Sequence, residues 1–226
     1  MNLNRILILP LLLLSRAGAT QIFFDTLPPT QQNGTYNGFV GGTIDGVRFD
    51  NLICDDFVPA TYVPSGPWAY DVSGLSGPDQ LEYARFGEAF NAIAKYEQAA
   101  LLLSGDGTSK LPGLLHVSSA DDITSYQYAI WRLFTPGREM RAHGAALVNP
   151  GTSDLLFSTV MDENLADPRF IPVYQDLRIY TPGASARSNQ EFLQVVSTPE
   201  PGTWTLVGIS AALLGIATYR RRARNH

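Results

Sequence analysis

The spacing of apolar residues changes twice along this chain, and that change constrains the fold more than any other feature of the sequence. Short aromatic and β-branched runs, divided by Gly, Asn, Asp and Pro, lie at residues 21–24, 38–40 and 47–49. Such runs are typical of strands and turns. Strand-like runs return at residues 169–174 and 190–196, after a segment with helical spacing. This order predicts an α+β domain whose strands form a β-sandwich or barrel around a central helical insert.

The central segment carries the helical pattern. Apolar residues recur at steps of three and four between residues 79 and 103, and Gly105 follows, which predicts an amphipathic helix that ends there. A second helix is predicted over residues 121–134, because Ser119 can accept a hydrogen bond from its first turn. A third helix is expected through residues 138–147.

Composition excludes several classes of protein. The 226 residues are 45% hydrophobic and 16% charged, which suits one well-buried domain. The net charge is −5, but six of the arginines lie near the two ends, so ten basic residues face twenty-one acidic ones in between. An acidic body is not expected to bind nucleic acid, whose phosphates it repels. One cysteine and three scattered histidines predict neither a disulfide framework nor a His/Cys metal site.

The first nineteen residues are typical of a secretory signal peptide. Arg5 precedes an apolar run over residues 6–14, and the small residues Ala17 and Ala19 suit cleavage by signal peptidase before Thr20. We therefore expect residues 1–19 to be removed on export.

The last part of the chain, residues 198–226, has three unlike features in order. A Pro-Glu-Pro-Gly motif occupies residues 199–202, and a nearly uncharged run follows over residues 204–219. Those sixteen residues would span about 24 Å as a helix, slightly less than a bilayer's hydrocarbon core. Interfacial aromatic residues border the run, and a basic cluster places the C-terminus in the cytoplasm. The residues concerned are Pro199, Glu200, Pro201, Trp204, Tyr219, Arg220, Arg221, Arg222 and Arg224.

This arrangement resembles the PEP-CTERM sorting signal of exported bacterial proteins. The resemblance implies an exosortase that cuts near Pro199, Glu200 and Pro201, so that the chain crosses the inner membrane only transiently. The body, residues 20–197, would then reach the cell surface or the extracellular matrix. A permanent membrane anchor is the alternative interpretation of the same segment.

Two residues of the body are unusual for their surroundings. Gln127 shares one face of the predicted second helix with Ile123, Ile130 and Phe134. A buried amide without partners costs about 1–3 kcal/mol, so Gln127 requires a hydrogen-bond partner. Cys54 is a single thiol in a protein bound for an oxidising compartment, where a free thiol is either shielded or chemically committed.

The segments around these two residues resemble surface thioester domains, also called Cys-Gln anchor domains. The similar segments are residues 52–57, Leu-Ile-Cys-Asp-Asp-Phe, and residues 126–131, Tyr-Gln-Tyr-Ala-Ile-Trp. The resemblance implies a helical segment beside a β-barrel or sandwich, and an internal thioester between Cys54 and Gln127. It also implies covalent capture of an amine on a partner, such as a lysine of a surface protein.

Two other classes remain open. A non-covalent structural or polysaccharide-binding protein could stack Trp68 and Tyr70 on sugar rings, although loop packing explains them as well. A glycoside hydrolase could use carboxylates among Asp55, Asp56, Asp121 and Asp122, but neither a G-x-S-x-G nor an H-E-x-x-H motif is present. We therefore expect a surface attachment or matrix protein that is not an enzyme and needs no cofactor.

Overall fold

The computed structural model describes residues 19–196, except 28–29, 33–34, 58–60, 62, 78–79, 106–112, 118 and 136–149. The predicted signal peptide and the predicted sorting segment lie outside these residues. Within them, no helix is both long and apolar enough to cross a membrane.

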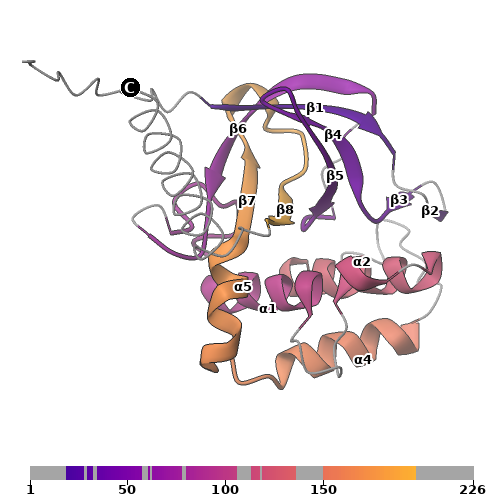
Figure 1. Cartoon of the computed structure of the whole chain (residues 1–226), viewed down its shortest axis with the longest axis vertical. Coiled ribbons are helices and arrows are strands. Elements are labelled where there is room, and N and C mark those ends of the chain that lie inside the picture. The colour runs from indigo at the N-terminus through magenta and orange to yellow at the C-terminus, as the bar shows by residue number, and fades with distance from the viewer. Residues whose placement is uncertain are drawn as a thin grey trace, which may run out of the picture.

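Six strands form a closed antiparallel barrel in the order β1-β4-β5-β8-β7-β6 (Figure 1). The strands are β1 (Thr20–Thr26), β4 (Val40–Ile44), β5 (Val47–Cys54), β6 (Ser65–Ser73), β7 (Leu177–Pro182) and β8 (Phe192–Val195). The short strands β2 (Thr30–Gln32) and β3 (Thr35–Asn37) pair with each other outside the barrel. The barrel therefore joins the first third of the body to its last segment, and the helices form the insert between them.

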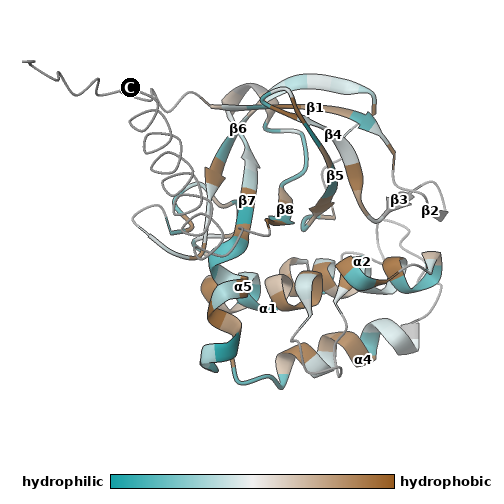
Figure 2. Ribbon diagram, viewed as in Figure 1, coloured by the Kyte–Doolittle hydropathy of each residue, from teal (hydrophilic) through white to brown (hydrophobic). Residues whose placement is uncertain are grey.

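The helices lie together at one end of the barrel, with α1 (Ala92–Ser104) and α2 (Ala120–Phe134) directly beneath the strands in Figure 1. Next to them pack α4 (Pro150–Met161) and the short helix α5 (Ile171–Asp176). Figure 2 shows hydrophobic residues on the strand ends that face these helices. This α+β architecture, with barrel-like strands and a central helical insert, confirms the predicted fold class.

The described residues form two apolar cores, and helix α2 contributes to both. The first core lies among the helices and the adjacent strand ends, and includes Ala129 and Ile130. The second core fills the barrel, where Tyr128 and Trp131 of α2 pack against barrel residues. Helix α2 therefore closes one end of the barrel with its aromatic side chains.

The predicted helix over residues 79–103 is wrong in its first half. Helix α1 begins only at Ala92, and the preceding residues form successive turns in which an N–H donates to the carbonyl three residues earlier. Leu81 and Asn91 adopt left-handed backbone conformations, with φ of 55° and 57°, which no α-helix accommodates. Phe90, one of the apolar residues in that predicted helix, is 87% exposed.

The second helix is confirmed. Helix α2 begins after Ser119, whose hydroxyl accepts a hydrogen bond from the backbone N–H of Asp122 at 3.4 Å, as the sequence predicted. The third predicted helix, over residues 138–147, lies outside the described residues. Helix α4 was not predicted from the sequence.

The predicted strand over residues 169–174 is also wrong. Asp167 accepts a hydrogen bond from the N–H of Arg169 and begins a 3-10 turn, and Pro172 occupies the first turn of α5. Proline is well accommodated there, because the first helical N–H groups need no intrahelical acceptor. The strand predicted over residues 190–196 is confirmed as β8, whereas β7 was not predicted.

Candidate functional site

Cys54 is the last residue of β5, at the end of the barrel that the helices close. It pairs in register with Phe192 of β8. Because side chains alternate along a strand, Leu52 and Cys54 face the same way, into the barrel core, whereas Ile53 faces the helical core. The Cys54 side chain is 7% exposed and is a free thiol.

Gln127 reaches Cys54 from the middle of α2 and is fully buried. Its Nε2 donates a hydrogen bond to the backbone carbonyl of Cys54 at 2.7 Å, and its Oε1 lies 3.9 Å from the Cys54 Sγ. The structure therefore brings together two residues that are 73 positions apart. The prediction that Gln127 requires a partner is confirmed.

Gly38 is a third component of the site that the sequence did not reveal. Its backbone N–H donates to Gln127 Oε1 at 3.4 Å. Gly38 has a φ of 109°, a conformation that side-chain-bearing residues rarely adopt, so this orientation of the N–H favours glycine. No sequence signal links Gly38 to Gln127, because they are 89 residues apart.

Aromatic rings surround the pair. Trp131, one helical turn after Gln127, has its ring centroid 4.9 Å from that of Phe57 and 5.2 Å from that of Tyr128. Both contacts are edge-to-face. Such packing excludes water from the space next to Cys54, which protects any electrophile formed there from hydrolysis.

The environment keeps Cys54 in its neutral thiol form. Burial raises the pKa of the thiol far above its ordinary value, and the negative charge of Asp56 raises it further. The indole N–H of Trp131 acts on the pKa in the opposite direction. Because the thiolate is disfavoured, Cys54 must lose its proton during any attack on Gln127 rather than before it.

A buried group of carboxyls follows Cys54 directly. The Asp55 carboxyl is fully buried, and no N–H or O–H in the described part of the chain donates to it. Burial, and then the charge of Glu191, raise its pKa well above its ordinary value, which favours the protonated form of Asp55. Glu191 accepts hydrogen bonds from the Tyr96 hydroxyl at 2.6 Å, from the Arg85 N–H at 2.7 Å and from the Thr181 hydroxyl.

Asp56 connects these buried carboxyls to the loop before α1. Its carboxylate pairs with the guanidinium of Arg85 and also accepts from the N–H of Glu191 at 3.2 Å. Burial raises the pKa of Asp56 to about 7, although Arg85 lowers it. Asp56 and Glu191 therefore link the end of β5 to the loop before α1, to α1 and to β7.

The other predicted site residues do not gather here. Tyr70 is fully buried inside the barrel, so it cannot stack on a sugar ring as the alternative interpretation required. Trp68 is partly buried against the same core. Asp121 and Asp122 are exposed in the first turn of α2, whereas Asp55 and Asp56 are buried at the end of β5. The described residues include no group of three or more His, Cys, Asp or Glu side chains suited to a metal ion.

Comparison with known proteins gives little further information. No family model matches the chain, and no curated protein matches it. A solved structure, the N-terminal domain of the Streptococcus pyogenes pilus tip adhesin Cpa, is similar over 80% of this chain and 95% of its own. The sequence identity is 12% and the TM-score is 0.41.

Proposed function

We propose that this domain forms an internal thioester between Cys54 and Gln127 and uses it to bind covalently to an amine on a partner molecule. The observation that carries the proposal is the contact between Cys54 Sγ and Gln127 Oε1 at 3.9 Å in a buried, aromatic-lined site. The carbonyl carbon of Gln127 is one bond from that oxygen. The nucleophile and its electrophile are therefore already adjacent.

The reaction has two steps. In the first, Cys54 Sγ bonds to the Gln127 carbonyl carbon, the carbon–nitrogen bond breaks, and the thiol proton leaves with the amide nitrogen as ammonia. Negative charge develops on Oε1 in the tetrahedral intermediate, where the Gly38 N–H already donates. In the second, a partner amine bonds to the same carbon and the carbon–sulfur bond breaks, which gives an amide and restores the protonated thiol.

The hydrogen bond from Gln127 Nε2 to the Cys54 carbonyl supports this assignment. It fixes the amide so that its oxygen, not its nitrogen, faces Gly38 and the sulfur. This orientation directs the amide nitrogen, which leaves as ammonia, toward the backbone carbonyl of Cys54.

The proposal includes the setting in which the domain acts. From the signal peptide and sorting segment predicted by the sequence, we propose export, cleavage by signal peptidase, exosortase processing, and a role in attachment at the cell surface or in the extracellular matrix. Single-use covalent capture suits that role, because a covalent bond resists mechanical load and dilution.

Intact-mass measurement of the purified body tests the thioester directly. The folded domain should be lighter than its sequence by one ammonia, have no titratable thiol, and gain methylamine with the appearance of one thiol. Cys54→Ala and Gln127→Ala should each remove all three signs. A folded wild-type domain at full sequence mass with a titratable Cys54 would contradict the proposal and favour a non-covalent matrix protein instead.

A further inference from the structure

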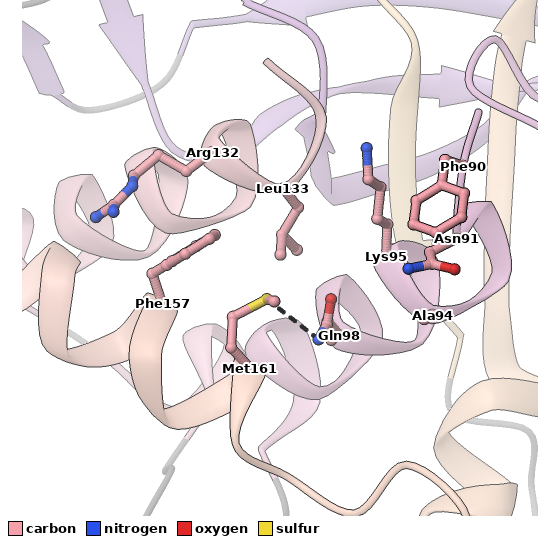
Figure 3. Close-up of a pocket in the computed structure, with 9 residues that line it drawn as sticks. All are labelled: Phe90, Asn91, Ala94, Lys95, Gln98, Arg132, Leu133, Phe157 and Met161. Atoms are coloured by element: carbon pink, nitrogen blue, oxygen red, sulfur yellow. Dashed lines mark hydrogen bonds between the residues drawn. The ribbon is translucent and has the colours of Figure 1, made fainter. Parts of the chain in front are cut away.

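A cavity of about 330 Å³ lies in the helical layer, between α1, α2 and α4 (Figure 3). Helix α2 contributes Arg132 and Leu133 to it. These residues follow Gln127 by five and six positions, which places them about 140° and 240° around the helix from the thioester pair. The cavity is therefore separate from the candidate thioester site.

The interior of the cavity is mostly apolar, and the Gln98 amide that also lines it donates a hydrogen bond to Met161 Sδ at 3.3 Å. Leu133, Phe157 and Met161 project into it from α2 and α4, as Figure 3 shows. Apolar surface continues onto the rim, where Phe90 is 87% exposed and Met161 is 50% exposed. An exposed aromatic ring next to an apolar hollow is unfavourable in water and is typical of a surface that a partner covers.

The charged residues that line the cavity are both cations, Lys95 and Arg132. Arg132 pairs with Asp154 and lies over the Phe157 ring at 4.2 Å, so it is already engaged. The Lys95 ammonium forms no ion pair with any residue that the structure describes.

The position of Lys95 reinforces its attraction for an anion. Lys95 lies in the first turn of α1, where the helix dipole adds to its positive charge. The cap residue Asn91, which also lines the cavity, makes no side-chain hydrogen bond to that turn. A carboxylate beside Lys95 would therefore interact favourably with both the ammonium and the helix end.

We propose that this cavity binds a peptide segment of a partner protein in which an aromatic or long aliphatic side chain lies next to a carboxylate residue. The apolar side chain fills the hollow over Leu133 and Met161, and the carboxylate pairs with Lys95. The exposed rim at Phe90 favours a peptide over a small molecule, because enclosed ligand sites cover most of their ligand and a peptide would also cover this ring. The inference does not depend on the thioester.

Titration of the folded domain with short peptides, followed by NMR chemical shifts, tests the inference. The peptide acetyl-Gly-Phe-Asp-Gly-amide should shift signals of Lys95 and Met161 in a saturable manner. Replacing Phe by Ala in the peptide should weaken binding about tenfold or more, and replacing Asp by Asn about twofold to fivefold. Equal binding of acetyl-Gly-Phe-Lys-Gly-amide would overturn the assignment of the carboxylate.

Variants of residues that lie outside the two buried cores separate binding from folding. Phe90→Ala and Lys95→Gln should each weaken binding of acetyl-Gly-Phe-Asp-Gly-amide. The matched changes Leu155→Ala on α4, at a residue that is 65% exposed and outside the cavity, and Arg48→Gln on the barrel should not. If phenylpropionate binds as tightly as the peptide, and Phe90→Ala does not weaken its binding, the cavity binds a small molecule and the peptide proposal is overturned. Unchanged peptide binding in Cys54→Ala would keep this proposal independent of the thioester.

Discussion

The side-chain amide of Gln127 hydrogen-bonds to the backbone carbonyl of Cys54 at 2.7 Å while its oxygen lies 3.9 Å from the sulfur of the same residue. One side chain thus contacts both the backbone and the thiol of Cys54. The backbone contact orients the amide, and the thiol contact brings the two reactive groups together. The two contacts have separable consequences for stability and for chemistry.

The stability consequence is tested in a Cys54→Ala background, where no thioester can form. Adding Gln127→Ala leaves the carbonyl of residue 54 and the N–H of Gly38 buried without this partner, so we expect a loss of about 1–3 kcal/mol in the free energy of unfolding. Urea unfolding measures it. Gln175→Ala, at an exposed glutamine of α5, should change stability by less than about 0.5 kcal/mol. Equal effects of the two changes would contradict a buried hydrogen-bonding role for Gln127.

The contribution of the Gly38 N–H is tested by Gly38→Ala. We expect a loss of about 1–3 kcal/mol from backbone strain at a φ of 109°, and slower thioester formation because the N–H moves away from Oε1. Gly46→Ala is the matched control, since Gly46 has a φ of 82° in the turn between β4 and β5, with no atom close to its position for a Cβ. Both variants should lose stability, but in time-resolved mass spectra of the refolding domain only Gly38→Ala should release ammonia more slowly.

The buried carboxyls predict how stability depends on pH. The pKa of Asp55 is raised well above its model-compound value of 3.8, and that of Asp56 is raised to about 7. Between pH 3.8 and the raised pKa of each group, the folded state therefore binds more protons than the unfolded state. Their contribution to stability is therefore fully present below pH 3.8 and is lost as the pH rises toward and beyond 7. Asp25 and Asp167 act in the opposite direction, because the Thr26 hydroxyl and then Arg48 lower the pKa of Asp25, and Arg169 lowers that of Asp167.

Asp55→Asn isolates the buried group. It removes one titrating carboxyl, so the fall in stability between about pH 4 and pH 7 should become shallower by up to about 1.4 kcal/mol per pH unit. Urea unfolding at a series of pH values measures the slope, and Asp121→Asn, at an exposed aspartate, should leave it unchanged. A slope that is the same in Asp55→Asn and in the wild type would be inconsistent with a raised pKa of Asp55.

The mature N-terminus of the exported protein should be Thr20. Ala17 and Ala19 supply the small side chains that signal peptidase accepts before its cleavage point. N-terminal sequencing of exported protein measures this, and a sequence that begins at Met1 would rule the signal peptide out.

The basic cluster at the C-terminus should be required for correct processing. Replacing Arg220, Arg221, Arg222 and Arg224 with glutamine removes the cytoplasmic charge that orients the segment, so release from the membrane should be incomplete. Membrane fractionation followed by immunoblotting measures the released fraction. Full release of the variant would show that the arginines play no part in sorting.

Local signals in the sequence were sufficient for part of the fold and for part of the site. The cap at Ser119 and the apolar face of residues 121–134 predicted α2, and the runs at residues 21–24 and 47–49 predicted strands where β1 and β5 lie. Each of these signals operates within a few residues, because a helical turn or a pleat is a short-range structure. The same reasoning failed at residues 79–91, where an apparent helical period occurs in successive turns.

Only the tertiary structure decided which distant groups meet. The pairing of β5 with β8 brings Glu191 beside Asp55 and Asp56, and the Gly38 backbone meets Gln127 through the packing of α2 against the barrel. The sequence by itself determined that Gln127, on an apolar helix face, needed a polar partner. The packing of α2 against the barrel supplied that partner, because a contact between residues 73 positions apart depends on how all the elements pack together and not on any local pattern.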